Sequence, residues 1–162
     1  MSKTVYIETS IISYLAARPN RDLIAAGHQQ LTHEWWTAER SSFAVYASAL
    51  VLREASGGDA AAASARLQWL QGIPLVVIAP EAEELSEHLI QQAALPEKAA
   101  ADALHIAIAA YHRLDFLLTW NCKHIANAVQ RPLIEHVCRE FGFEPPILCT
   151  PEELTGGKPD VE

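Results

Sequence analysis

Short strand-like segments alternate with helix-like segments along most of the chain. Runs rich in β-branched and aromatic residues are typical of strands, and here they are separated by stretches in which apolar residues recur at helical spacing. The expected strands cover residues 4–7, 42–46, 73–78, 116–119 and 146–149. Strands joined through helices pair in parallel with right-handed crossovers. The alternation therefore predicts an α/β fold, a three-layer α/β/α domain with a central, mostly parallel sheet of four to five strands.

Capping and breaking residues indicate where the helices between these strands begin and end. Serine or aspartate precedes several of them, and glycine or proline follows. The expected helices cover residues 11–17, 22–39, 49–55, 59–71, 80–94, 97–113, 122–128 and 133–141, and residues 150–153 have the composition of a helix start. A length of 162 residues suits one domain, which we expect over residues 1–155, with a flexible tail at 156–162.

The composition is that of an ordinary globular protein. Half of the residues are hydrophobic, and no apolar run reaches the roughly 18 residues that a membrane span needs. The first residues lead directly into a strand rather than a signal peptide. Cys122, Cys138 and Cys149 are odd in number, which favours reduced thiols over a disulfide framework. We therefore expect a cytoplasmic protein with no membrane segment and no structural disulfide.

The net charge of −8 bears on the class of substrate. Proteins that bind nucleic acid through many phosphate contacts normally carry a basic surface. The charge therefore predicts weak non-specific binding of nucleic acid and fits a basic partner. It does not exclude a nucleic-acid substrate, because a cation bound at an acidic cluster reverses the local field.

Three acidic residues lie where carboxylates are costly to bury. Glu8 closes the first expected strand, and Glu54 and Asp102 lie in helices of otherwise buried composition. An unpaired charge is almost never fully buried unless a partner charge or a metal offsets the loss of hydration. A shared divalent cation explains all three acids and predicts phosphoester chemistry. The alternative for Asp102 is a residue on the solvent-facing side of an amphipathic helix.

The expected topology places two further polar residues near these acids. Ligands of parallel sheets bind beyond the carboxyl ends of the strands. Glu8 follows the first strand and Asn121 lies two residues after the fourth, so both side chains can reach one crevice. His105 shares a helix face with Asp102 at a spacing of three. It either orients Asp102, contacts the substrate, or is an ordinary hydrogen-bonded core histidine.

Four segments of the chain resemble PIN domains. They are residues 5–10 (VYIETS), 48–54 (SALVLRE), 102–107 (DALHIA) and 117–125 (LLTWNCKHI), in the order found in that family. Over nearly its whole length, the chain resembles a PIN-domain ribonuclease of the VapC toxin type. The resemblance implies a metal-dependent endoribonuclease that hydrolyses RNA phosphodiesters with Mg²⁺ or Mn²⁺. It also implies the toxin component of a toxin-antitoxin system, controlled by an antitoxin protein.

The resemblance also implies roles for the polar residues. Glu8, Glu54 and Asp102 match the first three acids of the family and are the implied metal ligands, and Asn121 takes the fourth catalytic position. Glu8 is one methylene longer than the aspartate usual at the first position. Asn121 keeps a carbonyl acceptor but lacks the charge of the aspartate often found at the fourth. Both departures favour one well-held cation over two. The smaller number of charges in the site also predicts a low cation affinity.

Residues beside the implied ligands allow two interpretations each. Thr9 and Ser10 resemble the hydroxyl positions that assist the first acid, or they cap the helix that follows. Trp120 neighbours the expected crevice and can stack on a base, whereas the other tryptophans are expected in the core. Cys122 and His124 have the residue types of a zinc site but not its spacing.

Two alternatives to the ribonuclease remain open. A PIN-like module whose altered first and fourth positions have removed catalysis would bind RNA or an antitoxin protein. A phosphatase or dehalogenase with an aspartyl intermediate also places an acid after the first strand, but Glu8 is too long and no acid follows two residues later.

The expected helix at residues 22–39 is a candidate partner surface. Leu23, Leu31, Trp35 and Trp36 lie on it and would contact an antitoxin, a second copy of the chain in a homodimer, or the protein's own core.

Overall fold

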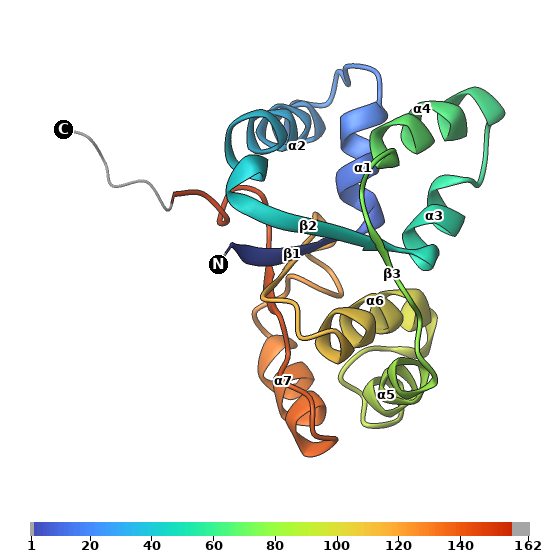
Figure 1. Ribbon diagram of the computed structural model, residues 1–162, viewed down its shortest axis with the longest axis vertical. Helices are drawn as coiled ribbons and strands as arrows, with labels where there is room; N and C mark the ends of the chain where they lie inside the picture. The colour runs from blue at the N-terminus through green and yellow to red at the C-terminus, as the bar shows by residue number, and fades with distance from the viewer. Residues whose placement is uncertain (1, 157–162) are drawn as a thin grey trace.

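Five parallel strands form one central sheet in the computed structural model, which describes residues 2–156 (Figure 1). The strand order is β3-β2-β1-β4-β5, so the first strand lies in the middle, and every pairing is parallel. The strands are β1 (Lys3–Ile7), β2 (Phe43–Ser48), β3 (Leu75–Val76), β4 (Phe116–Leu118) and β5 (Ile147–Cys149). The α/β class and the parallel sheet expected from the sequence are confirmed.

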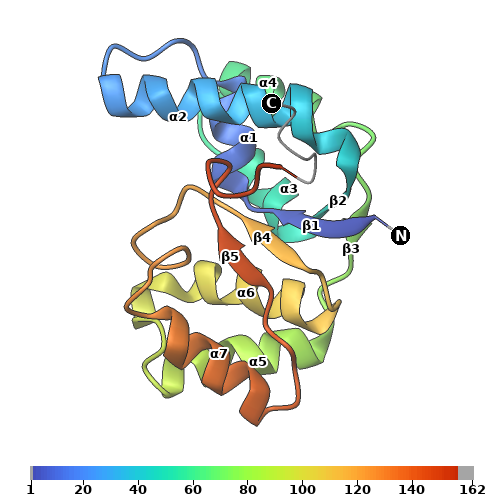
Figure 2. The same ribbon diagram turned by 90° about the vertical axis from the view of Figure 1, so that its left-hand side faces the viewer.

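Helices cover both faces of this sheet. Figures 1 and 2 show α1 to α4 on one side and α5 to α7 on the other, which gives the three expected layers. The helices are α1 (Thr9–Ala16), α2 (Leu23–Glu34), α3 (Ala49–Ala55), α4 (Ala60–Leu70), α5 (Pro80–Gln91), α6 (Ala100–Tyr111) and α7 (Arg131–Glu140). None of the helices in residues 2–156 combines the length and the apolar character that a membrane span requires.

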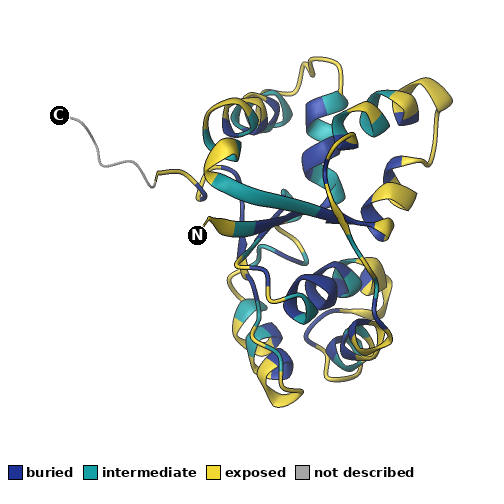
Figure 3. Ribbon diagram, viewed as in Figure 1, coloured by how far each residue is buried: buried dark blue, intermediate teal, exposed yellow. Residues whose placement is uncertain are grey.

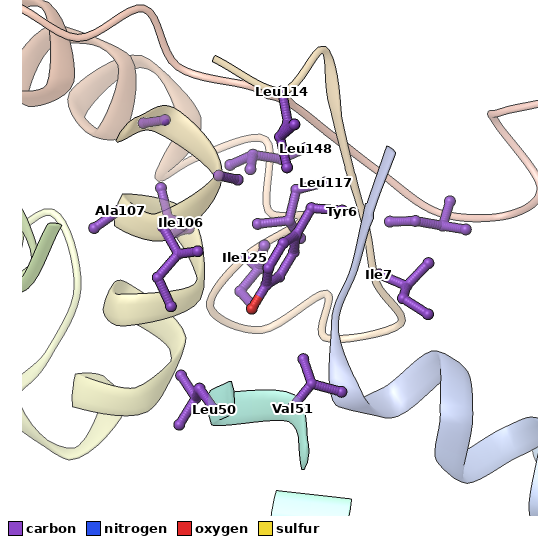
Figure 4. Close-up of a cluster of buried hydrophobic side chains, with 14 of the residues drawn as sticks. Tyr6, Ile7, Leu50, Val51, Ile106, Ala107, Leu114, Leu117, Ile125 and Leu148 are labelled. Atoms are coloured by element: carbon purple, nitrogen blue, oxygen red, sulfur yellow. The ribbon is translucent and has the colours of Figure 1, made fainter. Parts of the chain in front are cut away.

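The middle strand lies at the centre of the core. Val5, Tyr6 and Ile7 of β1 are fully buried, whereas β2 is mostly of intermediate burial in Figure 3. Figure 4 shows Tyr6 and Ile7 among core side chains that include Ile106 of α6 and Leu117 of β4. Because helices cover both faces of β1, a polar residue at the carboxyl end of this strand lies next to the buried core.

Two expected helices do not form in the part of the chain that the structure describes. Residues 122–128 make turns instead, because the side-chain amide of Asn127 donates to the carbonyl oxygens of Cys122 and Lys123. Such side-chain bonds compete with the backbone ladder of a helix. Residues 150–153 make a single turn closed onto its first carbonyl group, without continuing as a helix.

Several element boundaries differ from those expected. The helix expected at residues 22–39 ends regularly at Glu34 and continues as a π-helical turn, η1 (Trp35–Glu39), and a 3-10 turn, η2 (Arg40–Ser42). The helix expected at residues 97–113 begins as a 3-10 turn, η3 (Glu97–Ala99). Apart from Gly156, the tail expected at 156–162 lies outside the described residues.

Candidate functional site

Glu8 lies at the carboxyl end of β1 and is the N-cap of α1. Its side chain is buried, with only 7% exposure, and accepts hydrogen bonds from three donors. The backbone nitrogen of Ser10 donates to Oε2 at 3.0 Å, and the hydroxyls of Ser10 and Thr119 each donate to Oε1 at 2.5 Å. These bonds replace the hydration that the carboxylate loses on burial.

The hydroxyls of Thr9 and Ser10 do not cap α1. The cap is the Glu8 carboxylate, which accepts from the backbone nitrogen of Ser10, while Thr9 donates its hydroxyl to Glu54 at 2.6 Å. The capping interpretation of these hydroxyls is therefore wrong. A carboxylate at an N-cap also gains from the positive end of the helix dipole, which explains why an acid is well placed there.

Glu54 reaches the same region from the last turn of α3. That helix begins after Ser48, whose hydroxyl accepts from the backbone nitrogen of Val51 at 3.4 Å. Glu54 Oε1 accepts from Thr9 and lies 2.6 Å from Nε2 of His105. Burial raises the pKa of Glu54, but the bonds from His105 and Thr9 outweigh it, so the pKa lies below its ordinary value and the side chain is ionised at neutral pH.

His105 is a buried, hydrogen-bonded histidine on α6. The residue has no exposed surface, and both ring nitrogens have partners, Tyr6 at Nδ1 and Glu54 at Nε2. Its carboxylate partner is Glu54 rather than Asp102, the residue with which the sequence associates it. His105 is therefore a hydrogen-bonded core histidine, and it also contacts one of the acids.

Asp102 lies in the first turn of α6 and is half-buried. Burial raises the pKa of Asp102, the side chain of Asn121 opposes that rise, and the negative charge of Glu8 adds to it, with a net increase. Asp102 therefore lies near enough to Glu8 for the charge of one carboxylate to disfavour ionisation of the other. Its partial burial lies between that of a core residue and that of a fully exposed helix position, and its use as a metal ligand stays a prediction.

Asn121 organises the loop that follows β4. Its side-chain oxygen accepts from the backbone nitrogen of His124 at 3.0 Å, and its own backbone nitrogen donates to the Thr119 hydroxyl at 2.9 Å. The carbonyl oxygen expected to serve the site is therefore engaged within the loop, and the side chain favours the ionised form of Asp102. Its use as a fourth catalytic group stays a prediction.

Trp120 is anchored next to the site rather than free. Its ring stacks on His28 with centroids 3.9 Å apart, Tyr14 meets its edge, and Nε1 donates to the Thr32 hydroxyl at 2.7 Å. The backbone nitrogen of Trp120 also donates to the Ser10 hydroxyl at 2.9 Å. These contacts fasten the loop after β4 to α1 and α2, and base stacking by Trp120 stays a prediction.

One cluster of potential metal ligands stands out among the described residues. Oxygen atoms of Glu8 and Glu54 and a ring nitrogen of His105 lie within 4.8 Å of one another. Asp102 is outside this group, so the structure brings together two of the three expected ligands, Glu8 and Glu54, and the role of Asp102 as a ligand stays a prediction. The cysteine and histidine pairs form no such cluster among residues 2–156.

Sequence reasoning missed three residues that build this site. The Thr119 hydroxyl donates to Glu8 at 2.5 Å. The Tyr6 hydroxyl lies 2.6 Å from Nδ1 of His105 and 2.8 Å from the Ser48 hydroxyl. Thr119 carries a signal, since a hydroxyl residue that ends a buried strand needs a partner. The Tyr6 and Ser48 pair gives none, because only the register of β1 against β2 brings the two strands' side chains together.

The fold is shared with solved toxin structures. VapBC2 from Rickettsia felis, solved bound to a DNA fragment from their promoter, matches with a TM-score of 0.59 and 14% identity, covering 91% of this chain and 98% of that chain. VapC20 from Mycobacterium tuberculosis, described as a sarcin-ricin loop cleaving toxin, matches with a TM-score of 0.58 and 14% identity, covering 74% and 92%. No protein-family model and no curated protein matches the chain. The PIN-like fold expected from the sequence is confirmed.

Proposed function

We propose that this protein is an endoribonuclease that hydrolyses RNA phosphodiesters with Mg²⁺ or Mn²⁺ as its cofactor. The observation that carries the proposal is that carboxylate oxygens of Glu8 and Glu54 lie within 4.8 Å of each other at the carboxyl end of β1, with Asp102 near enough for the charge of Glu8 to raise its pKa. Oxygen ligands are those that these hard cations prefer. The fold shared with VapC20, a sarcin-ricin loop cleaving toxin, supports the same class of activity.

The residues present fit a divalent cation. Among residues 2–156, no lysine or arginine makes an ion pair with any of the three carboxylates. No described residue donates to Oε2 of Glu54, while its Oε1 is occupied by Thr9 and His105. Carboxylates gathered without a cationic side chain repel one another, and a bound cation removes that repulsion.

Each acid has a supporting group that holds it for this chemistry. Ser10 and Thr119 hold Glu8, His105 and Thr9 hold Glu54, and the side chain of Asn121 partly offsets the rise in the pKa of Asp102. When bound, the cation supplies a water of lowered pKa and neutralises charge that develops on the phosphoryl oxygens. The chain's own contribution is to fix the ligand oxygens before RNA binds.

We extend the proposal to a cytoplasmic toxin that is controlled by an antitoxin protein, a role supported by the fold shared with VapBC2. The first turn of α2 offers an apolar surface, since Leu23 is 86% and Ile24 is 70% exposed. Trp35 lies in the core instead, so only the start of this helix serves as a partner surface. The same surface would serve a homodimer.

The alternative is a PIN-like module that binds RNA or an antitoxin without cleaving RNA. It is favoured by the uncharged Asn121 at the fourth position, whose side-chain oxygen already accepts from the backbone nitrogen of His124.

Cleavage of a labelled total-RNA pool tests the two proposals. With purified protein, we expect cleavage in Mg²⁺ or Mn²⁺ and none in EDTA, with activity restored when the cation is returned in excess. The Asp102→Asn protein, purified in the same way, is the control for contaminating nuclease, because a contaminant would cleave RNA equally in both samples. Retarded migration of RNA without any cleavage in either cation would contradict the ribonuclease and support the binding module.

A further inference from the structure

A chain of buried hydrogen bonds runs from the start of α3 to the proposed cation site. The hydroxyls of Ser48 and Tyr6 lie 2.8 Å apart, the Tyr6 hydroxyl lies 2.6 Å from Nδ1 of His105, and Nε2 of His105 lies 2.6 Å from Glu54 Oε1. Ser48, Tyr6 and His105 have no exposed surface. Figure 4 shows the Tyr6 ring in the core with its hydroxyl on the side of Leu50 and Val51, the first turn of α3.

Counting donors and acceptors gives this hydrogen-bond chain a direction. The Ser48 hydroxyl already accepts from the backbone nitrogen of Val51, so its own proton is available for the Tyr6 oxygen. The Tyr6 proton then goes to Nδ1 of His105, and the proton on Nε2 goes to Glu54. In this arrangement every proton has an acceptor.

The reverse arrangement leaves two groups without partners. If Nδ1 of His105 donated to Tyr6, Tyr6 would donate to Ser48, and no described residue accepts the remaining Ser48 proton. A neutral ring in that tautomer would also point the lone pair of Nε2 at an ionised Glu54 oxygen 2.6 Å away. Both outcomes are costly for buried polar groups, and the ring lies where water cannot compensate.

The direction of the hydrogen-bond chain decides whether His105 can bind a metal. With its proton on Nε2 and its Nδ1 lone pair occupied by Tyr6, the ring has no free lone pair for a metal, although it lies within 4.8 Å of the acids. Together with Thr9 it fills Oε1 of Glu54 and leaves Oε2 without a described donor.

We infer that His105 is a positioning residue, held in one tautomer by Ser48 and Tyr6, that fixes Glu54 through Oε1 and leaves Oε2 for the cation. This inference rests on the proposed cation site and adds that its ligands are oxygen atoms only. Partners that orient a metal-binding carboxylate or histidine typically change metal affinity or activity by about 10–100-fold when they are removed.

Two substitutions at His105 separate positioning from structural support. The amide of His105→Asn ends near the position of Nδ1 and keeps the Tyr6 contact, whereas that of His105→Gln reaches the position of Nε2 and donates to Glu54. We expect His105→Asn to lower Mn²⁺ affinity by about 10–100-fold, and His105→Gln to recover most of that loss. Mn²⁺ affinity is measured by electron paramagnetic resonance on the protein without RNA.

Tyr6→Phe is the second variant and keeps the imidazole in place. Removing the hydroxyl leaves Nδ1 without its donor, so we expect Mn²⁺ affinity to fall in the same direction while thermal unfolding stays cooperative. Affinities equal to wild type in both His105→Asn and Tyr6→Phe would overturn the positioning role.

The tautomer gives an independent readout. In ¹⁵N-histidine-labelled protein, with the His105→Gln variant used for assignment, we expect the His105 proton on Nε2 both before and after Mg²⁺ is added. Transfer of that proton to Nδ1 when Mg²⁺ binds would show that Nε2 is a ligand and would overturn the inference while leaving the proposed ribonuclease intact. A wild-type protein that binds neither cation would instead overturn the proposed function, and with it the cation site that His105 serves.

Discussion

Asp102→Asn is expected to abolish RNA cleavage and to raise the thermal stability of the metal-free protein. The carboxylate is proposed to hold the cation, so its loss should lower the cleavage rate by about 100-fold or more, which corresponds to a few kcal/mol of transition-state stabilisation. The amide keeps the size of the side chain and its position beside Asn121 but carries no charge.

The expected gain in stability follows from the raised pKa of Asp102. A carboxyl group with a higher pKa in the folded protein than in the unfolded chain binds protons more tightly when folded. Stability is therefore lost as the pH rises from the ordinary value of 3.8 through the raised value, and the loss is complete at neutral pH. The asparagine variant does not suffer this loss, so its midpoint of thermal unfolding at pH 7 should lie above that of wild type.

Two measurements on three proteins check this pair of effects. Cleavage rates in Mn²⁺ and unfolding midpoints in EDTA are compared for wild type, Asp102→Asn and the matched control Asp22→Asn. Asp22 is the exposed N-cap of α2, where asparagine caps a helix as well as aspartate, so the control should leave both values unchanged. Cleavage that persists in Asp102→Asn would remove Asp102 from the site, and a lower unfolding midpoint would show that the residue is structural.

A stabilising effect of the cation is expected only where the site is intact. Because ligands that bind the native state alone raise its stability by mass action, Mn²⁺ should raise the unfolding midpoint of wild type and not that of Asp102→Asn. The binding module without a cation site predicts no shift for either protein.

The parallel sheet was predictable from the sequence because each strand carries its own local signal. The segment at residues 4–7 is β-branched and aromatic, it is followed directly by helix-forming residues, and parallel pairing is the arrangement that such connections allow. The helix expected at residues 122–128 does not form, for a reason that the composition of the segment does not show. The side chain of Asn127 satisfies two backbone carbonyl groups there and makes a turn more favourable than a helix.

The proximity of Glu8 and Glu54 was predictable from the sequence, whereas the residues that hydrogen-bond to them were not. Glu8 and Asp102 are conspicuous because they interrupt apolar segments, whereas the partner of His105 depends on which helices meet across the sheet. Spacing along α6 associates His105 with Asp102, yet its ring points to Glu54 of α3. Contacts between residues 51 positions apart follow from the tertiary structure, and periodicity along a single helix carries no information about them.

Glu8→Gln is expected to lose cation binding and also to destabilise the protein, in contrast to Asp102→Asn. Both oxygens of Glu8 accept hydrogen bonds, Oε2 from the Ser10 backbone and Oε1 from the hydroxyls of Ser10 and Thr119. An amide nitrogen at the Oε2 position would face the N–H of Ser10, which cannot turn away. At the Oε1 position it would force both hydroxyls to accept, and the proton of the buried Thr119 hydroxyl would lose its carboxylate acceptor.

Either orientation of the amide leaves a buried donor unsatisfied, which typically costs about 1–3 kcal/mol. Chemical unfolding should therefore show a lower free energy of unfolding for Glu8→Gln, while Glu152→Gln on the exposed surface should match wild type. Glu8→Asp keeps the charge but is one methylene shorter, so it should retain part of the cation affinity while weakening the contact with Thr119. Glu8→Gln could instead be as stable as wild type and still bind Mn²⁺. The Glu8 carboxylate would then be neither a stabilising hydrogen-bond acceptor nor a ligand, and the proposed site would consist of Glu54 and Asp102 alone.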